Sequence, residues 1–369
     1  MRFEREGEVL HEELIGRDGF EGPSSLLYHR HLPETAQDVV EGIEDDIPVE
    51  SEKVHEHAHL EGFRLQAHGD TITGRQWLLV NDDVRIGLLA PQQQQEVLFV
   101  DASADDVLFV HAGSGTLRTQ FGRIGFSRHD FLVIPRGTVY RLELDGLDAA
   151  RLLVMEVTGA IDAPDRYRCR SGQLTEAAPY SERDLRGPEA LEGESGPVQV
   201  WVKRASRISC YSVDQHPFDV VGWDGSVYPV AFNIHDFEPR AGRFALPLPE
   251  HQAFAATNVA IHCLVPRRSG SDAEAAPLPY HHMSLDRDEV RYFVETGQPA
   301  PPRVRPGSLT HHVGGLPHGP ILGERSATSA EAGDLAIGVE TARPLHRTQL
   351  ARQVIDSDYR FSWRPATTG

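Results

Sequence analysis

The histidines near the end of the chain are the residues whose types and spacing could bind a metal. His281 and His282 stand in the segment PYHHMSLDRDEVRYFVETG, ahead of Glu289, and His318 stands in the tight turn PHGP. Two imidazoles and one carboxylate on neighbouring strands are the ligand set of a non-haem Fe(II) site, which leaves open positions for oxygen and substrate. We therefore expect these residues to form a metal site.

The two adjacent histidines cannot both be ligands in the simplest geometry. Successive side chains of an extended chain point to opposite faces. One of His281 and His282 would then bind the metal, while the other would orient a ligand or contact substrate. His311 and His312 precede the PHGP turn, and either would support a ligand or face the substrate. The alternative interpretation is a polar loop in which Glu289 is a surface carboxylate.

A second group of histidines alternates in the segment HEHAH as His55, His57 and His59. A spacing of two places side chains on one face of a strand, where they could bind a metal. No partner carboxylate is evident downstream. We therefore expect a polar, solvated edge here.

Short apolar runs of strand type, such as DVLFVHAG and DFLVIP, dominate residues 76–165 and are separated by Gly- and Pro-containing turns. Strands at this spacing, without a helical period, indicate an all-β sandwich or barrel. Residues 105–142 resemble a cupin barrel. We expect two tandem cupin-like (jelly-roll) barrels, divided into an irregular N-terminal arm (1–75), a first barrel (76–165), a connector (166–205) and a second barrel with the metal site (206–369).

The first barrel lacks the expected ligands. The segment QQQQEVLFVDASADD stands where a metal-bearing cupin would place its His pair and Glu, and Tyr140 stands where the last His would follow the PRG turn. His111 and His129 remain, but a single histidine on a strand or turn is more often packed or solvated. The first barrel is therefore expected to be structural and metal-free.

Composition excludes several classes of protein. The 369 residues carry a formal net charge of -19, which disfavours binding to phosphate backbones. Three cysteines are too few for a disulfide framework or a Cys-based zinc site. No run of about 18 apolar residues predicts a membrane span, and the acidic N-terminal segment does not resemble a signal peptide. We expect a cytoplasmic protein that binds neither membrane nor nucleic acid.

Several segments together resemble the homogentisate 1,2-dioxygenase family. These are GFEGPSSLLYHRHLP in the arm, TQFGRI in the first barrel, FDVVGWDGSVYPVAFNIHDF at 218–237, LPLPEH, PYHHM followed by DEV, GSLTHH, PHGP and DLAIGVET, in the family's order. The FDVVGW run and the PHGP turn are the most distinctive. The resemblance covers most of the chain.

The resemblance implies roles for particular residues. The family binds Fe(II) through a His after a Tyr, a Glu several residues on, and the His of PHGP, which correspond to His281, Glu289 and His318. The spacing from His281 to Glu289 exceeds the family's by two residues, so the choice between His281 and His282 stays open, although the preceding Tyr280 favours His281. Tyr280, His282 and His312 are expected to contact substrate. The family's acid/base His corresponds to His251, whose imidazole could take the proton of a phenol near neutral pH.

The implied reaction is the cleavage of homogentisate by O2 to maleylacetoacetate in an oligomer built from trimers. The chain departs from the family after Glu289, where TGQPAPPRVRPG has no tyrosine to meet the substrate. Arg243, Arg303 or Arg305 could bind a substrate carboxylate. One alternative is another hydroquinone-type or gentisate-like substrate. A second is a cupin that binds zinc or nickel and acts as an isomerase, hydrolase or sensor.

Overall fold

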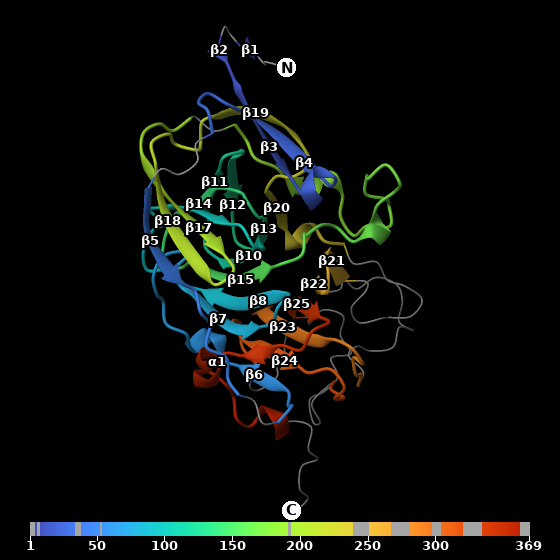
Figure 1. Ribbon diagram of the computed structural model, residues 1–369. Helices are drawn as coiled ribbons and strands as arrows, with labels where there is room; N and C mark the ends of the chain where they lie inside the picture. The colour runs from blue at the N-terminus through green and yellow to red at the C-terminus, as the bar shows by residue number, and fades with distance from the viewer. Residues whose placement is uncertain are drawn as a thin grey trace, which may run out of the picture.

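The structure, a computed structural model, describes residues 4–5, 8–33, 38–51, 54–190, 193–238, 251–266, 281–296, 304–319 and 334–361. Regular structure in these residues is almost entirely β (Figure 1), which confirms the expected all-β class. The α-helix α1 covers Gln349–Gln353, and short 3-10 helices cover Asp18–Phe20, Gly62–Arg64, Asp165–Tyr167, Glu182–Asp184, Ile234–Asp236 and Tyr359–Phe361. None of the helices in these ranges is long and apolar enough to cross a membrane.

An eight-stranded sheet forms the centre of the molecule, in the order β16-β20-β13-β10-β15-β8-β7-β26. Its strands are β16 (Leu185–Arg186), β20 (Val230–Asn233), β13 (Asp130–Ile134), β10 (Asp105–Ala112), β15 (Arg151–Val157), β8 (Val84–Leu89), β7 (Arg75–Val80) and β26 (His346–Arg347).

A seven-stranded sheet, in the order β12-β11-β14-β9-β17-β18-β5, packs on one face of the central sheet. Its strands are β12 (Gly122–Phe126), β11 (Gly115–Thr119), β14 (Tyr140–Leu144), β9 (Leu98–Asp101), β17 (Val198–Arg204), β18 (Arg207–Val213) and β5 (Asp38–Glu44). Smaller sheets are β19-β4-β3 and β1-β2. They consist of β19 (Val220–Gly225), β4 (Ser24–His29), β3 (His11–Gly16), β1 (Glu4–Arg5) and β2 (Glu8–Val9).

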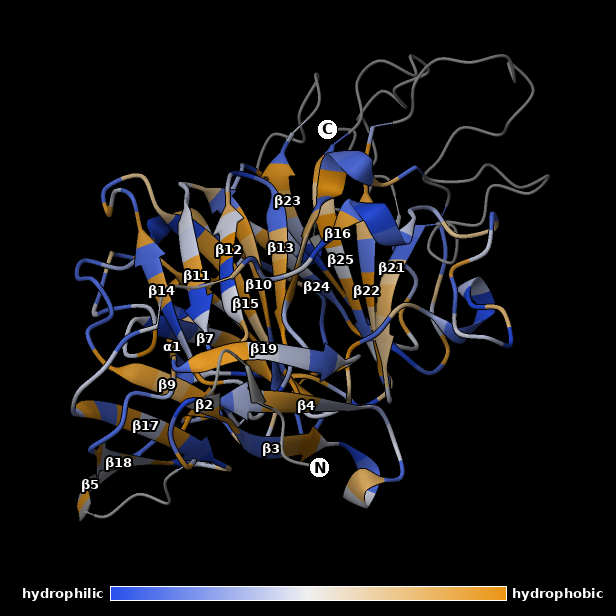
Figure 2. Cartoon of the chain, turned by 90° about the horizontal axis from the view of Figure 1, so that it is seen from above, coloured by the Kyte–Doolittle hydropathy of each residue, from blue (hydrophilic) through white to orange (hydrophobic). Residues whose placement is uncertain are grey.

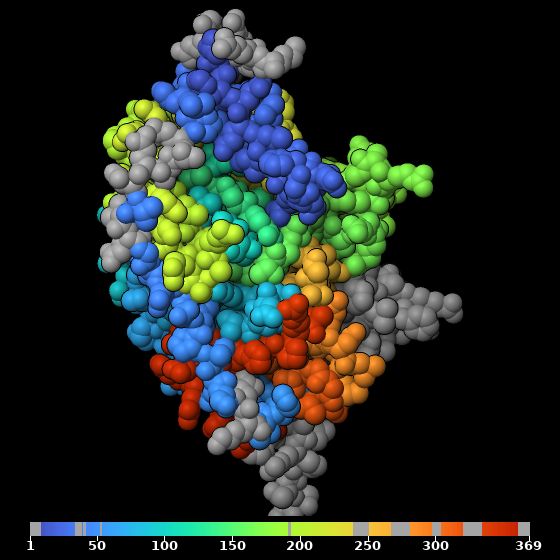
Figure 3. Space-filling view, in the orientation of Figure 1, coloured from blue at the N-terminus to red at the C-terminus, as the bar shows by residue number. Residues whose placement is uncertain are grey.

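A six-stranded sheet packs on the other face of the central sheet, in the order β21-β22-β25-β23-β24-β6. Its strands are β21 (Gln252–Ala256), β22 (Val259–Leu264), β25 (Leu335–Thr341), β23 (Asp288–Glu295), β24 (Leu309–His312) and β6 (Ala58–Leu60). Figure 3 shows the orange and red residues of this sheet at the end of the molecule opposite the blue N-terminal strands.

Alternation along the strands explains this layering. In β10, Leu108 and Val110 pack toward the seven-stranded sheet, whereas Val107 and Phe109 pack toward the six-stranded sheet. Both faces of the central sheet are therefore apolar, and Figure 2 shows β10 and β13 largely in orange. Successive side chains of a strand point to opposite faces. A strand buried on both sides therefore reads as a continuous apolar run.

The same alternation divides β23 into two faces. Val290, Tyr292 and Val294 are buried in the core against the central sheet. Glu289 and Arg291 alternate with them and are only partly buried. Along β23, core residues on the inner face of the six-stranded sheet thus alternate with polar residues on its outer face.

The strand pairing bears on one expected boundary, at residue 206. That residue lies in the turn of the hairpin formed by β17 and β18, in which Arg204 pairs with Arg207. Strand β20, which was expected in the second barrel, pairs with β13 of the first barrel through Phe232 and Phe131. The end of the expected connector is therefore part of a hairpin.

The N-terminal arm is also more regular than expected. Strands β3 and β4 pair over their whole lengths. Strand β6 pairs with β24, with Leu60 opposite Leu309, and so belongs to the six-stranded sheet although it lies about 250 residues earlier in the sequence. Figure 3 accordingly shows light-blue residues among the orange and red ones.

Candidate metal centre

Three side chains on the outer face of the six-stranded sheet converge on one point. His282 Nε2 lies 3.5 Å from Glu289 Oε2, and His318 Nε2 lies 3.3 Å from the same oxygen. All three candidate ligand atoms lie within 4.8 Å of one another. We call these three residues the His–Glu–His cluster.

The backbone holds the two histidines together. His282 N–H donates to the carbonyl of His318 at 2.8 Å, and His318 N–H donates back to His282 at 2.9 Å. This isolated bridge needs the close approach of Gly319, because a Cβ there would lie 2.7 Å from the Cα of His281. The PHGP turn is thus fixed against the segment before β23.

The bridge also decides between the adjacent histidines. His282 is partly buried and belongs to the cluster, whereas the His281 side chain is exposed and lies outside it. The geometry therefore favours His282 over His281 as the first ligand, and the ligand assignment itself stays a proposal. The pairing of residue 282 with residue 318 points the side chain of His282, and not that of its neighbour, toward Glu289.

Electrostatics prepare Glu289 to bind a cation. Burial acts to raise its pKa, but hydrogen bonds from His282 and His318 outweigh burial and lower the pKa to about 2. Glu289 is thus a carboxylate at neutral pH. Across the ladder, burial and the nearby charge of Glu289 raise the pKa of Glu340 to about 7.

Two further imidazoles support the cluster. The ring of His312 stacks on that of His318, with centroids 4.1 Å apart, and the ring of His57 meets His318 edge-on at 5.3 Å. Val313 N–H donates to His57 Nδ1, and His57 Nε2 lies 3.3 Å from the carbonyl of Pro317. A carbonyl only accepts, so Nε2 carries the proton.

Both supporting rings are neutral. Burial lowers the pKa of His57 to about 4 and, together with neighbouring positive groups, holds the pKa of His312 well below its usual range. Neutral rings next to His318 add no positive charge that would repel a cation.

His57 is a residue of the site that the sequence analysis missed. The HEHAH segment was expected to be a solvated edge, but His57 and His59 are buried and only His55 is exposed. The alternating spacing of these histidines was the sequence signal that could have identified His57. The partner carboxylate lies more than 200 residues away, and only the pairing of β6 with β24 brings it near.

Asp288 anchors the start of β23. Its carboxylate accepts hydrogen bonds from the backbone N–H groups of Gly314 and Leu345, and it pairs with His311 at 3.0 Å. His311 is buried here and points away from the cluster side of β24, where His312 lies. Asp288 therefore ties both His311 and the loop that leads to the PHGP turn to the start of β23.

The donor set of the His–Glu–His cluster fits a divalent metal. Ligands at about 2.1 Å from an octahedral metal lie about 3 Å from one another when they are adjacent. The two separations from Glu289, 3.3 and 3.5 Å, are close to that value. Two nitrogens and one oxygen on one side of a metal also match the facial arrangement of non-haem iron proteins.

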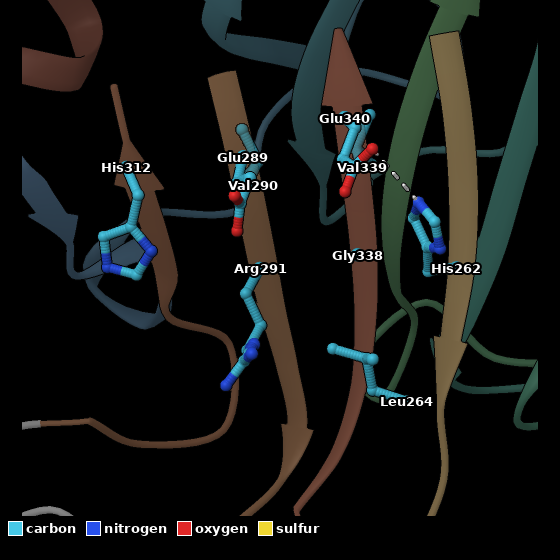
Figure 4. Close-up of a pocket in the computed structure, with 9 residues that line it drawn as sticks. All are labelled: His262, Leu264, Glu289, Val290, Arg291, His312, Gly338, Val339 and Glu340. Atoms are coloured by element: carbon cyan, nitrogen blue, oxygen red, sulfur yellow. Dashed lines mark ion pairs between the residues drawn. The ribbon is translucent and has the colours of Figure 1, made fainter. Parts of the chain in front are cut away.

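A pocket opens beside the cluster on the same face of the sheet. It is an open hollow, and the space of about 280 Å³ between its side chains includes open solvent. Figure 4 shows the side chains that line it, with Glu289 and Arg291 from β23 between His312 of β24 and Glu340 of β25. The lining residues are His262, Leu264, Glu289, Val290, Arg291, His312, Gly338, Val339 and Glu340.

The other residues expected at the site have different outcomes. His312 lines the pocket, as expected for a substrate contact, although contact itself stays a prediction. His251 is buried at the start of β21, with Nδ1 3.2 Å from the carbonyl of Cys263. Tyr280, Arg243 and Arg303 lie outside the described residues. Arg305 lies over the ring of Phe63 instead of the pocket.

The first barrel contains a second convergent group, the carboxylate cluster of Asp101, Asp106 and Glu156. Arg75 Nη1 lies 3.0 Å from Asp106 and 2.8 Å from Glu156, and Lys203 Nζ lies 2.6 Å from Glu156. Tyr140, at the position of the missing cupin histidine, donates to Asp106 at 2.6 Å. The protein's own cations therefore compensate these carboxylates.

Known proteins resemble the chain over much of its length. The family model described as "Homogentisate 1,2-dioxygenase N-terminal" matches residues 68–234. A protein of Saccharolobus solfataricus named "Putative dioxygenase" is 32% identical over 368 residues, which are 98% of this chain and 95% of that protein. Homogentisate 1,2-dioxygenase of Rhodopseudomonas palustris is 27% identical over 284 residues, 71% of this chain and 62% of that enzyme.

Among solved structures, a cupin 2 conserved barrel domain protein from Leptotrichia buccalis matches 79% of this chain and 99% of its own, with 12% identity and a TM-score of 0.35.

Proposed function

The chain belongs to the homogentisate 1,2-dioxygenase family, and we propose that it is an Fe(II)-dependent dioxygenase that cleaves a dihydroxylated aromatic ring at the His–Glu–His cluster. The observation that carries the proposal is the convergence of two imidazoles and one carboxylate beside a pocket that opens to solvent. Homogentisate is the leading substrate. Its conversion to maleylacetoacetate takes up both atoms of O2 and consumes no other reductant.

In this proposal His282, Glu289 and His318 hold the metal. Ferrous iron supplies the binding and activation of O2 together with the binding of a deprotonated ring hydroxyl. The chain's own residues fix the ligands. His57 and His312 pack against His318, and the mutual hydrogen bonds of residues 282 and 318 set the distance between the two imidazoles.

Substrate handling falls to residues that line or flank the pocket. His312 faces the pocket beside Glu289, and its Nε2 lies 3.0 Å from the hydroxyl of Tyr359, which restrains the ring. For His251 we propose the acid/base role that the family resemblance implies. Its Nδ1–H donates to the carbonyl of Cys263, so Nε2 would carry the lone pair that accepts a phenol proton.

Anaerobic loading followed by oxygen uptake tests the proposal. The purified chain is reconstituted with Fe(II) and then mixed with homogentisate, gentisate or methylhydroquinone in an oxygen-electrode cell. Uptake stoichiometric with homogentisate supports the leading reaction. Uptake with only the other rings changes the substrate. If no aromatic compound consumes O2 and the protein as purified holds stoichiometric zinc, the oxygenase proposal is refuted.

A matched pair of variants tests the ligand assignment. His282→Ala should lose bound iron, because it removes one of the three converging atoms. His281→Ala removes the exposed neighbouring imidazole and should retain it. The opposite result would restore His281 as the ligand. The cytoplasmic location and the assembly from trimers stay predictions.

A further inference from the structure

Arg291 is a pocket residue that the sequence analysis did not single out. It follows Glu289 by two positions on β23, so both side chains lie on the outer face of the six-stranded sheet. Figure 4 shows its side chain below Glu289, between the strands that carry His312 and Gly338. The guanidinium therefore borders the same pocket as the proposed metal ligand.

Neither of the residues directly opposite Arg291 carries a carboxylate. Its direct neighbours in the sheet are Thr310 on β24 and Gly338 on β25. Gly338 has no side chain, and a Cβ there would lie 3.1 Å from that of His262. The glycine thus makes room for His262, which lines the same pocket.

Among the described residues, the Arg291 guanidinium has neither an ion pair nor a hydrogen bond, and its one contact of note is with the ring of Phe293, whose centroid is 5.9 Å away. Many other arginines are paired, as Arg128 is with Glu295 at 2.6 Å. The two acidic side chains that line the pocket lie next to histidines. Glu289 contacts two histidines, and Glu340 lies 3.8 Å from His262.

The charge of Arg291 lies at the pocket. Arg291 is half-buried and lines the same space as Glu289 and His312. A half-buried guanidinium without an anionic partner among the described residues is suited to an anionic ligand. Its planar fork binds a carboxylate through two parallel hydrogen bonds.

We propose that Arg291 binds the carboxylate of the aromatic substrate, so that the pocket selects dihydroxylated rings with an acidic side chain over neutral hydroquinones. Residues two apart on a strand are about 6.6 Å apart. One ring can therefore place a hydroxyl at the His–Glu–His cluster and a carboxylate at Arg291. Arg291 takes the role that Arg243, Arg303 or Arg305 was expected to fill, and the proposal rests on the proposed ring-cleaving function for its chemistry.

Anaerobic binding tests the proposal without turnover. Calorimetry on the iron-loaded chain compares 2,5-dihydroxyphenylacetate with its uncharged amide. The unaltered protein should bind the carboxylate at least about 10-fold more tightly than the amide. Arg291→Gln should weaken carboxylate binding by about 10- to 100-fold and change amide binding by less than about 3-fold. Arg291→Lys should retain part of the preference because it keeps the charge but not the fork.

Arg183→Gln is the matched control. The Arg183 side chain is 89% exposed, so this variant removes the same charge far from any described pocket contact and should bind both compounds as the unaltered protein does. Equal iron content and equal circular dichroism spectra exclude a folding defect. If Arg291→Gln weakens both compounds equally, or neither, Arg291 does not recognise the carboxylate.

Oxygen uptake separates this inference from the proposed function. If Arg291→Gln raises KM for the carboxylate alone and leaves kcat with methylhydroquinone unchanged, both proposals hold. Uptake that is insensitive to the variant and equal for charged and neutral rings would refute the role of Arg291 while the ring-cleaving function stands. A carboxylate preference that Arg291→Gln abolishes in a protein without oxygen uptake would refute only the function.

Discussion

The two convergent groups of side chains in this protein differ in what compensates their acids. In the first barrel, the carboxylate cluster is buried and surrounded by Arg75 and Lys203, which neutralise it from within the chain. In the six-stranded sheet, the ion-pair partners of the Glu289 carboxylate among the described residues are imidazoles, and the carboxylate borders a pocket.

The contrast shows how similar barrels acquire different roles. A buried carboxylate must be paired, because removing a charge from water costs several kcal/mol. When the chain supplies the cation, the pairing strengthens the fold and leaves no place for a ligand. When the chain supplies neutral imidazoles, the carboxylate retains the capacity to bind a metal ion, and metal affinity depends on deprotonated ligands of this kind.

The largest effect is expected from a variant that breaks the His–Glu–His cluster. Glu289→Ala should reduce bound iron to background, since it removes the only carboxylate among the three converging atoms. The loss of affinity should exceed about 100-fold, the upper range for partners outside the ligand set. Metal analysis after Fe(II) loading and desalting measures it. Full retention of iron would contradict the assignment of Glu289 as a ligand.

The corresponding change in the first barrel should affect stability instead of metal content. Lys203→Met leaves Asp45 and Glu156 without the ammonium that lies 2.8 Å from Asp45 and 2.6 Å from Glu156. Breaking a buried ion pair costs about 3–5 kcal/mol, and urea unfolding should show a loss near the lower value because Arg75 and Arg85 still contact Glu156.

A double variant provides the control for that measurement. Lys203→Met combined with Glu156→Gln removes both partners and should recover part of the lost stability. Iron content should match that of the unaltered protein in both variants. If Lys203→Met released iron without lowering stability, the distinction between the two clusters would be wrong.

The pH dependence of stability sharpens the same contrast. Burial, with the charges of Asp106 and Glu156, raises the pKa of Asp101 to about 7, against about 4 in an unfolded chain. Between these two pH values, Asp101 is protonated in the folded protein and ionised in the unfolded chain. Its contribution to stability therefore falls as the pH rises from about 4 to about 7. Asp101→Asn cannot ionise. It should be more stable than the unaltered protein by up to about 4 kcal/mol at pH 8 and nearly equal in stability at pH 4.

Unfolding of both proteins by urea at the two pH values measures this difference. The backbone N–H groups of Ser103 and Ala104 donate to Asp101 Oδ1, and an asparagine oxygen can accept the same bonds. An advantage that is the same at pH 4 and pH 8 would show that the carboxylate of Asp101 is not the group that titrates.

The smallest expected effect concerns the support of the His–Glu–His cluster. His57→Phe keeps an aromatic ring against His318 but removes the hydrogen bonds with Val313 and Pro317. Loss of such a supporting partner should weaken iron binding by about 10-fold. His55→Phe alters the exposed neighbour and should leave the affinity unchanged. Competition with a chelator measures both, and equal affinities in the two variants would exclude a supporting role for His57.

Local pattern was sufficient for much of the fold and for part of the site. Short apolar runs predicted an all-β chain. A strand buried on both faces reads as a continuous apolar run, and a strand buried on one face reads as alternating apolar and polar residues. A carboxylate at the head of the apolar strand VRYFV and a histidine in the rigid PHGP turn were sufficient to single out Glu289 and His318. The boundary expected at 206 falls in a hairpin turn, because β17, at the end of the expected connector, pairs with the strand that follows it.

The amino-acid sequence by itself determined which side chains are available for chemistry and, through a period of two, which of them share a face of a strand. Only the tertiary structure decided which faces meet. The bridge between residues 282 and 318 selected His282 over His281, the pairing of β6 with β24 brought His57 to the site, and the neighbours of Arg291 left its charge unpaired among the described residues. The physical reason is that strand pairing joins segments far apart in the chain, and a change of one residue in that pairing turns every side chain to the other face.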